Sequence, residues 1–203
     1  MDPARLDGVL AFLAAAERLK DTLRSGTTSG GRRESAAEHS WRLCLLVSLL
    51  DRELGGVDRL RLMKLCLIHD LGEAISGDTP ATDQTPDDGR IARERADFAT
   101  LCAPLPADLR AEMAALWEDY AAGASPEAAL AKGLDKIETV LQHAIGANPA
   151  DFDYGFNLAY GRDRTEAHPL LRQIRDRADA ATRARIADQQ ITDQRMADQS
   201  SQA

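Results

Sequence analysis

The segment KLCLIHDLGEAISGDTP, residues 64–80, joins an apolar run to a cluster of acids. The apolar part ends in His69-Asp70, and Glu73 and Asp78 follow shortly afterwards. A carboxylate buried without a partner is costly, so Asp70 needs a cation or several hydrogen-bond donors beside it. The segment therefore predicts a buried helix that ends at a charged site.

The composition favours a single helical domain. The chain has 203 residues, of which 44% are hydrophobic and only 4% aromatic. This length suits one globular domain, and a core made of Leu, Ala, Ile and Val favours helices over a β-sandwich. No segment shows the alternating pattern of a strand. The sequence therefore predicts an all-α fold.

Apolar periodicity and capping residues divide the chain into helices. The glycine-rich stretch SGTTSGG at 25–31 and the proline-containing stretch 77–89 are expected to be loops. Residues 148–165 are expected to form an irregular crossing with a short helical piece. The expected helices are 4–24, a helix from a cap at Ser35 to about Leu54, a helix from a cap at Asp58 to about Ser76, 90–103, 107–122, and a helix starting at Ser125-Pro126.

The expected domain occupies residues 1–165, and a last helix, residues 166–190, is expected to pack on it. The polar segment 191–203 is expected to be disordered. A net charge of -8 argues against a non-specific nucleic-acid binder. The three cysteines form no C-x-x-C pair, which indicates a reducing compartment. The N-terminal stretch matches neither a signal peptide nor a membrane span, so we expect a cytoplasmic protein with no membrane partner.

Two of the four histidines occupy buried helix faces. His39 lies four residues before Leu43, and His69 lies four residues after Leu65. Asp135 lies in a third apolar helix. These residues are either satisfied core histidines and a solvated aspartate, or ligands that three helices send to one divalent metal ion, such as Mn, Co, Fe, Zn or Mg. His143 is about 12 Å beyond Asp135 along a helix, so we interpret it as structural.

The order His39 … His69-Asp70 … Asp135 resembles the H…HD…D signature of the HD-domain metal-dependent phosphohydrolases. With the string HDLGEAISGD, it is similar to the branch that contains the 5′-deoxynucleotidases, over about residues 5–165. The resemblance implies an all-helical HD-domain bundle and one divalent metal ion held by His39, His69, Asp70 and Asp135. It also implies hydrolysis of nucleoside 5′-monophosphates and a homodimer.

The resemblance implies further roles for charged residues. Arg24 matches a basic residue that contacts the phosphate, and Arg32 or Arg33 would assist it. Glu73 and Asp78 match acids near the attacking water. Asp78 is the preferred partner of that water, and Glu73 lies on the helix face of the metal ligands.

The sequence departs from the family pattern at one position, and alternatives to the nucleotidase function stay open. Ser25 stands where the 5′-deoxynucleotidases carry an aromatic residue beside the sugar, which leaves open the choice between ribose and deoxyribose. The substrate could also be a phosphoester that is not a nucleotide. A helical module with a structural metal ion and no turnover is the non-enzymatic alternative. A two-iron oxygenase would need more ligands than His39 and His69 supply.

Overall fold

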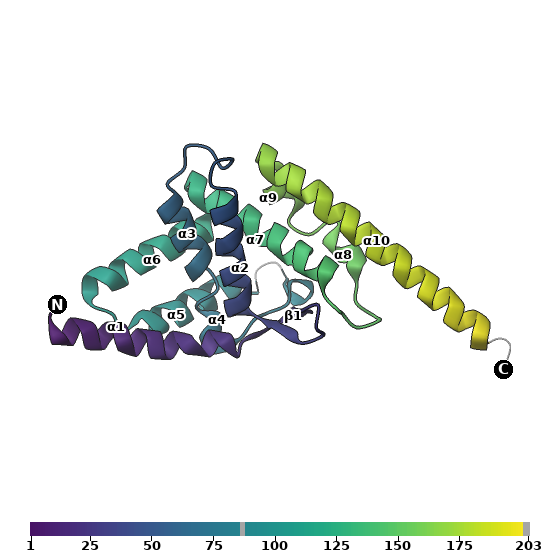
Figure 1. Ribbon diagram of the computed structural model, residues 1–203. Coiled ribbons are helices and arrows are strands. Elements are labelled where there is room, and N and C mark those ends of the chain that lie inside the picture. Colours follow the sequence, from purple (N-terminus) through teal and green to yellow (C-terminus); the bar gives the residue numbers. More distant parts are fainter. Residues whose placement is uncertain (86–87, 201–203) are drawn as a thin grey trace.

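A computed structural model describes residues 1–85 and 88–200 of the chain. Figure 1 shows a bundle of helices with one small hairpin. The helices are α1 Pro3–Ala16, α2 Ala36–Leu49, α3 Arg59–Ile68, α4 Glu73–Ser76, α5 Arg90–Cys102, α6 Ala107–Ala122, α7 Pro126–Ile145, α8 Tyr154–Asn157, α9 Arg162–Glu166 and α10 Pro169–Ser200. Two 3₁₀ turns, Glu17–Lys20 and Ala81–Asp83, and the strands β1 Leu23–Thr27 and β2 Arg33–Ser35 complete the described elements.

Helix α7 is the central element of the fold. It packs against α2, α3, α6, α9 and α10, and most of its residues are buried. Leu134 on this helix and Leu43, Leu62 and Leu65 on α2 and α3 are completely buried in one apolar cluster. Burial of several large aliphatic side chains at one place is the main stabilising contribution to such a bundle. The all-α fold and the single domain are therefore confirmed.

The predicted helix starts are confirmed for the three helices that carry the candidate ligands. Ser35 and Glu38 form a capping box at the start of α2. The Asp58 side chain accepts from the Arg61 N–H at the start of α3, and Ser125 caps α7 in the same way. These caps satisfy backbone N–H groups that have no partner within the helix.

The predicted helix from Asp58 to about Ser76 is wrong in its second half. Helix α3 ends at Ile68, and the short helix α4 begins only at Glu73. Between them the chain forms 3₁₀-type turns, in which the Leu71 and Glu73 N–H groups donate to carbonyls three residues earlier. His69 and Asp70 therefore lie at the end of a helix instead of inside one.

The prediction that the chain contains no strand is also wrong. β1 and β2 form a two-stranded antiparallel sheet, in which Leu23 pairs with Ser35 and Thr27 pairs with Arg33. The predicted helix 4–24 accordingly ends at Ala16 and continues only as a 3₁₀ turn. The strands are too short and too polar to show alternation, so periodicity does not reveal them.

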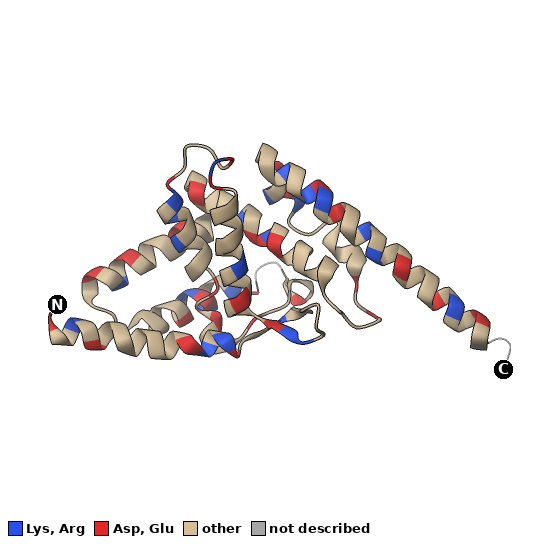
Figure 2. Cartoon of the chain, viewed as in Figure 1, with Lys and Arg blue, Asp and Glu red and all other residues tan. Residues whose placement is uncertain are grey.

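The C-terminal helix is longer than expected. α10 continues to Ser200, although the sequence predicts a disordered tail from residue 191. No glycine or proline follows Pro169, so no residue type interrupts the helix. Residues 201–203 of the predicted tail lie outside the described residues. Figure 2 shows acidic and basic residues interspersed along this helix.

Within the described part of the chain, none of the helices has the length and apolar character that a membrane crossing requires.

Candidate metal centre

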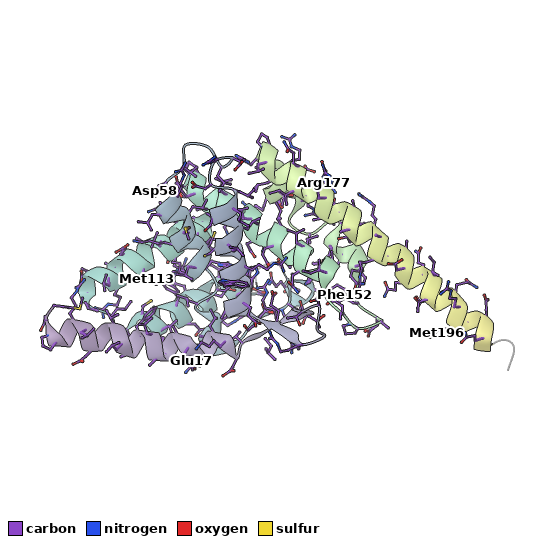
Figure 3. The ribbon with its side chains drawn as sticks, viewed as in Figure 1. Glu17, Asp58, Met113, Phe152, Arg177 and Met196 are labelled. Atoms are coloured by element: carbon purple, nitrogen blue, oxygen red, sulfur yellow. The ribbon has the colours of Figure 1, made fainter. Side chains whose placement is uncertain are left out.

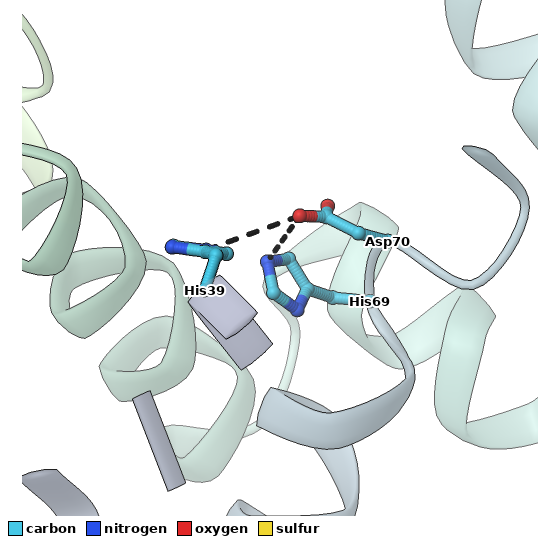
Figure 4. Close-up of side chains that lie close together, drawn as sticks. All are labelled: His39, His69 and Asp70. Carbon is cyan, nitrogen blue, oxygen red and sulfur yellow. Dashed lines mark ion pairs between the residues drawn. The ribbon is translucent and has the colours of Figure 1, made fainter. Parts of the chain in front are cut away.

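Four ligand atoms from three segments converge at the end of α3. His39 comes from α2, His69 and Asp70 follow α3, and Asp135 comes from α7. His39 Nε2 lies 3.2 Å from Asp135 Oδ1 and 3.9 Å from Asp70 Oδ2. His69 Nε2 lies 3.1 Å from Asp70 Oδ2 and 3.8 Å from Asp135 Oδ1. Figure 4 shows His39 and His69 directed at the same Asp70 carboxylate.

The donor set fits a divalent metal ion. Both Nε2 atoms are buried, and neither makes a hydrogen bond despite the carboxylate oxygens beside it. Neighbouring ligand atoms in a tetrahedral site with bonds of ~2.1 Å lie roughly 3.4 Å apart. The four nitrogen-to-oxygen distances, from 3.1 to 3.9 Å, bracket that value. Two imidazoles and two carboxylates could therefore hold such an ion.

The other nitrogen of each imidazole has its own partner. His69 Nδ1 donates to the Cys66 carbonyl at 2.9 Å. His39 Nδ1 donates to the Glu138 carboxylate, and Arg42 lies 3.1 Å from that carboxylate. These contacts favour the tautomer that leaves Nε2 free to bind a metal ion.

The charges at the site favour a cation. Burial alone would lower the pKa of His69, but Asp70 and Asp135 raise it to about 10. Burial alone would raise the pKa of Asp70, but His69 and Arg24 hold it below its usual range. Without a metal ion, a proton on His69 thus balances part of the negative charge. A bound metal ion would replace that proton.

Arg24 reaches the centre from β1. Its Nη1 donates to Asp70 Oδ2 at 3.2 Å, and its Nη2 donates to Thr139 Oγ1 at 3.1 Å. Burial opposes its charge, but Asp70 and Asp135 raise the pKa of Arg24. The guanidinium group is therefore charged and lies beside the candidate ligands, where it could hold a phosphate.

Glu73 and Asp78 line the same pocket. Burial first, and then Asp70 and Asp78, raise the pKa of Glu73 to about 9. Burial and the nearby Asp70 likewise raise the pKa of Asp78, although Arg24 opposes the shift. Glu73 Oε2 is buried and makes no hydrogen bond within the described structure. A raised pKa makes the Asp78 carboxylate a stronger base. Glu73, with a pKa of about 9, is mostly protonated near neutral pH.

Arg32 and Arg33 lie elsewhere. Arg32 forms a paired contact with Glu38, with nitrogen-to-oxygen distances of 2.6 and 2.9 Å. Arg33 donates to the Leu23 and Arg24 carbonyls across the hairpin. Neither residue lines the pocket, so the structure does not bring these arginines to the candidate centre.

The pocket has a volume of about 500 Å³ and includes residues that the sequence reasoning missed. His143, expected to be structural, lines it, and its Nδ1 donates to Asn157 Oδ1 at 2.9 Å. Lys136 also lines the pocket and pairs with Asp135 at 2.9 Å. Phe152, labelled in Figure 3, lies in the segment between α7 and α8, with its ring centroid 4.9 Å from that of His143. Other pocket residues without a sequence-based assignment include Arg90, Trp117, Tyr120, Lys132, Phe156, Tyr160 and Arg164.

A helical bundle with two histidines and two aspartates at the base of a pocket defines a class of metal-dependent phosphohydrolases. The model of the HD domain family matches residues 16–175, and the chain belongs to this family. The resemblance read from the motif order is therefore confirmed.

Several proteins of that family are similar to this chain. The 5′-deoxynucleotidase HDDC2 of Mus musculus is 34% identical over 140 residues, which is 66% of this chain and 68% of the relative. The Bos taurus protein of the same name is 29% identical over 185 residues, with 88% of each chain covered. A crystal structure described as a predicted metal-dependent phosphohydrolase from Magnetospirillum magnetotacticum has a TM-score of 0.73 and 28% identity. That match covers 91% of this chain and 96% of the other.

Proposed function

We propose that this protein removes the 5′-phosphate of (deoxy)nucleoside monophosphates with a metal-activated water. The observation that carries the proposal is the convergence of His39, His69, Asp70 and Asp135 at a pocket that also contains Arg24. Relatives that match 66% and 88% of the chain carry the name 5′-deoxynucleotidase, which supports a nucleotide substrate.

The bound metal ion would polarise a phosphoryl oxygen and lower the pKa of a water molecule. The chain's own residues supply positioning and charge neutralisation, which phosphoryl transfer requires most. Arg24 holds non-bridging phosphate oxygens with two N–H groups. Asp78 accepts a proton from the water, and Glu73 supports the metal ligands.

The alternative of a structural metal ion is less well supported. A structural site is closed by its protein ligands. Here, three further ionisable groups, Arg24, Glu73 and Asp78, line a pocket next to the candidate ligands. Charged groups around an accessible centre suit a site that binds and converts an anion.

The nucleoside would lie on the aromatic side of the pocket. Ser25 lines the pocket but has no aromatic ring to place beside the sugar. Phe152 and Phe156 line it as well, and they supply aromatic faces from another segment of the chain. A nucleobase can stack on such faces. This arrangement supports a nucleoside over a small phosphoester.

The identity of the metal ion, the cytoplasmic location and the homodimer stay predictions. The single divalent ion could be Co, Mn, Fe, Zn or Mg, because imidazole and carboxylate ligands suit several of these ions.

The test is phosphate release from a panel of ribo- and deoxyribonucleoside 5′-monophosphates with each of these metal ions. Asp70→Ala should lower kcat/KM at least about 100-fold, because it removes a ligand of the candidate centre. Asp188→Ala, at an exposed position on α10, is the matched control and should keep normal activity. A wild-type protein that binds metal but releases no phosphate from any of these nucleotides would contradict the proposal.

A further inference from the structure

One part of the pocket is lined by basic side chains that the proposed reaction does not use. Lys132 and Lys136 come from α7, Arg164 comes from α9, and Arg90 is the first residue of α5. Arg24, which is assigned to the scissile phosphate, contacts Thr139 instead. The basic side chains therefore form a group distinct from Arg24.

These cations differ in their acidic partners. Lys136 pairs with Asp135 at 2.9 Å, and Arg90 pairs with Glu94 at 2.8 Å. Lys132 forms no ion pair with any carboxylate in residues 1–85 and 88–200. Its Nζ lies 4.5 Å from the ring centroid of Tyr120, so the ammonium group rests on an aromatic face inside the pocket.

Lys132 and Arg164 both lie beside Gly123. A Cβ built on Gly123 would lie 3.5 Å from the Lys132 Cδ and Cε atoms and 3.9 Å from Arg164 Nη1. Arg164 has a carboxylate partner, Asp163 at 3.3 Å, but both of these side chains are more than half exposed. Two like charges side by side repel each other, and a bound anion would relieve that repulsion.

The position of Lys132 relative to the candidate metal centre follows from the helix geometry. Lys132 precedes Asp135 by three residues on α7, or about 4.5 Å along the axis. Thr139, which contacts Arg24, follows Asp135 by about one turn, and His143 by about two. Along α7, therefore, Lys132 lies on one side of the centre, and Arg24 and Phe152 lie on the other.

We propose that Lys132 and Arg164 form a second anion subsite that binds the outer phosphates of a nucleoside 5′-diphosphate or 5′-triphosphate. The inner phosphate would lie at the candidate metal centre beside Arg24, and the nucleoside would lie towards His143 and Phe152. Lysine acts as a point charge for such phosphates and arginine as a planar fork, so the pair suits a flexible phosphate chain. This proposal rests on the proposed function and extends its ligand class beyond monophosphates.

The test compares two nucleotides that differ by one phosphate. Deoxyadenosine 5′-diphosphate is added as a competitor while hydrolysis of deoxyadenosine 5′-monophosphate is followed, with divalent metal in excess over total nucleotide. The diphosphate should bind at least about tenfold more tightly than the monophosphate. Lys132→Met should weaken diphosphate binding about tenfold to a hundredfold, because one charge-assisted contact is lost. The KM of the monophosphate should change less than about threefold, because its single phosphate does not reach Lys132.

Matched variants separate the subsite from general charge and folding effects. Lys132→Arg keeps the charge and should retain tight diphosphate binding. Lys20→Met removes an exposed lysine outside the pocket and should leave the binding of both nucleotides unchanged. Arg164→Met gives a second measurement in case Lys132→Met fails to fold. If Lys132→Met weakens the binding of both nucleotides equally, or leaves diphosphate binding unchanged, the proposal is overturned.

Two further arms identify the source of the phosphates and separate this proposal from the proposed function. Pyrophosphate alone should compete more weakly than the diphosphate, and equal competition would show a site for free polyphosphate instead. If the protein hydrolyses no nucleotide, the proposed function fails. Calorimetric titration of the metal-loaded protein with each nucleotide then still tests the subsite, since a preference for the diphosphate that depends on Lys132 would support it. Lack of that preference would reject it.

Discussion

The two candidate metal-binding histidines differ in what fixes their second nitrogen. His69 Nδ1 donates to a neutral carbonyl, that of Cys66, at 2.9 Å. His39 Nδ1 donates to a carboxylate, that of Glu138, which is 1% exposed. Arg42, 3.1 Å away, partly balances the charge of that carboxylate. A carboxylate partner raises the basicity of a ligating imidazole more than a carbonyl does, so Glu138 should strengthen metal binding through His39.

We therefore expect Glu138→Gln to weaken metal binding about 10- to 100-fold, since the amide can still accept a hydrogen bond but carries no charge. Calorimetric titration of the metal-free protein measures this directly. Activity at saturating metal should stay within a few-fold of normal. Glu112→Gln removes an exposed carboxylate that pairs with Lys64 and serves as the control. Unchanged metal affinity in Glu138→Gln would show that the hydrogen bond alone orients His39.

At the residue scale, the sequence reveals site residues that are polar within apolar stretches. It does not reveal residues whose role depends on contacts with distant parts of the chain. Asp70 and Asp135 stand out because each is an acid in an apolar stretch of the sequence. Glu138 lies between Ile137 and Val140 and carries the same signal. Arg32 is predicted to assist Arg24 at the phosphate, but in the structure it contacts Glu38, and that contact depends on how the hairpin folds back onto α2.

At the scale of elements, the turn between α3 and α4 places the acids. Gly72 lies in this turn, and a Cβ there would lie 3.0 Å from the Glu94 carbonyl oxygen and 3.4 Å from the Phe98 nitrogen. The turn is thus pressed against the backbone of α5. Glu73 follows directly and Asp70 precedes by two residues, so movement of this turn would displace both carboxylates.

Gly72→Ala should therefore destabilise the protein by about 1–3 kcal/mol, because the added methyl group must displace backbone rather than a flexible side chain. For a chain of this size, the Tm should fall about 2–4 °C per kcal/mol. Gly56→Ala is the matched control, since a Cβ there meets nothing within 4 Å. It should leave the Tm unchanged or slightly raised. Equal Tm values for the two variants would contradict the close packing at Gly72.

The sequence predicts the elements well where caps and periodicity agree and poorly where tertiary contacts decide. The Ser35 and Asp58 caps were correctly placed because the hydrogen bonds involved are local. The end of α3 was missed because Leu71 and Ala74 continue the apolar pattern beyond Ile68. The hairpin was missed because Gly26 reads as a loop residue. In the structure Gly26 is in β1, where a Cβ would lie 2.8 Å from the His143 ring.

At the scale of the whole molecule, α10 supports one wall of the pocket. Figure 1 shows this helix beside α8 and α9, with its C-terminal end extending away from the bundle. Arg175 on α10 is 1% exposed and donates to the Asn157 carbonyl at 2.5 Å and the Tyr160 carbonyl at 2.6 Å. Its Nε donates to Asp179 Oδ1 at 2.6 Å. One buried cation thus joins the C-terminal helix to the segment that lines the pocket.

Arg175→Met should lower the free energy of unfolding by about 3–5 kcal/mol, because it leaves the buried Asp179 without its main partner and two carbonyls without a donor. Urea denaturation measures the loss. The double variant Arg175→Met, Asp179→Leu should recover part of it, since the uncompensated charge is then gone. Arg172→Met, an exposed position on the same helix, is the control. A loss below about 1 kcal/mol in Arg175→Met would mean that α10 is held by its apolar contacts with α7 and that Arg175 adds little.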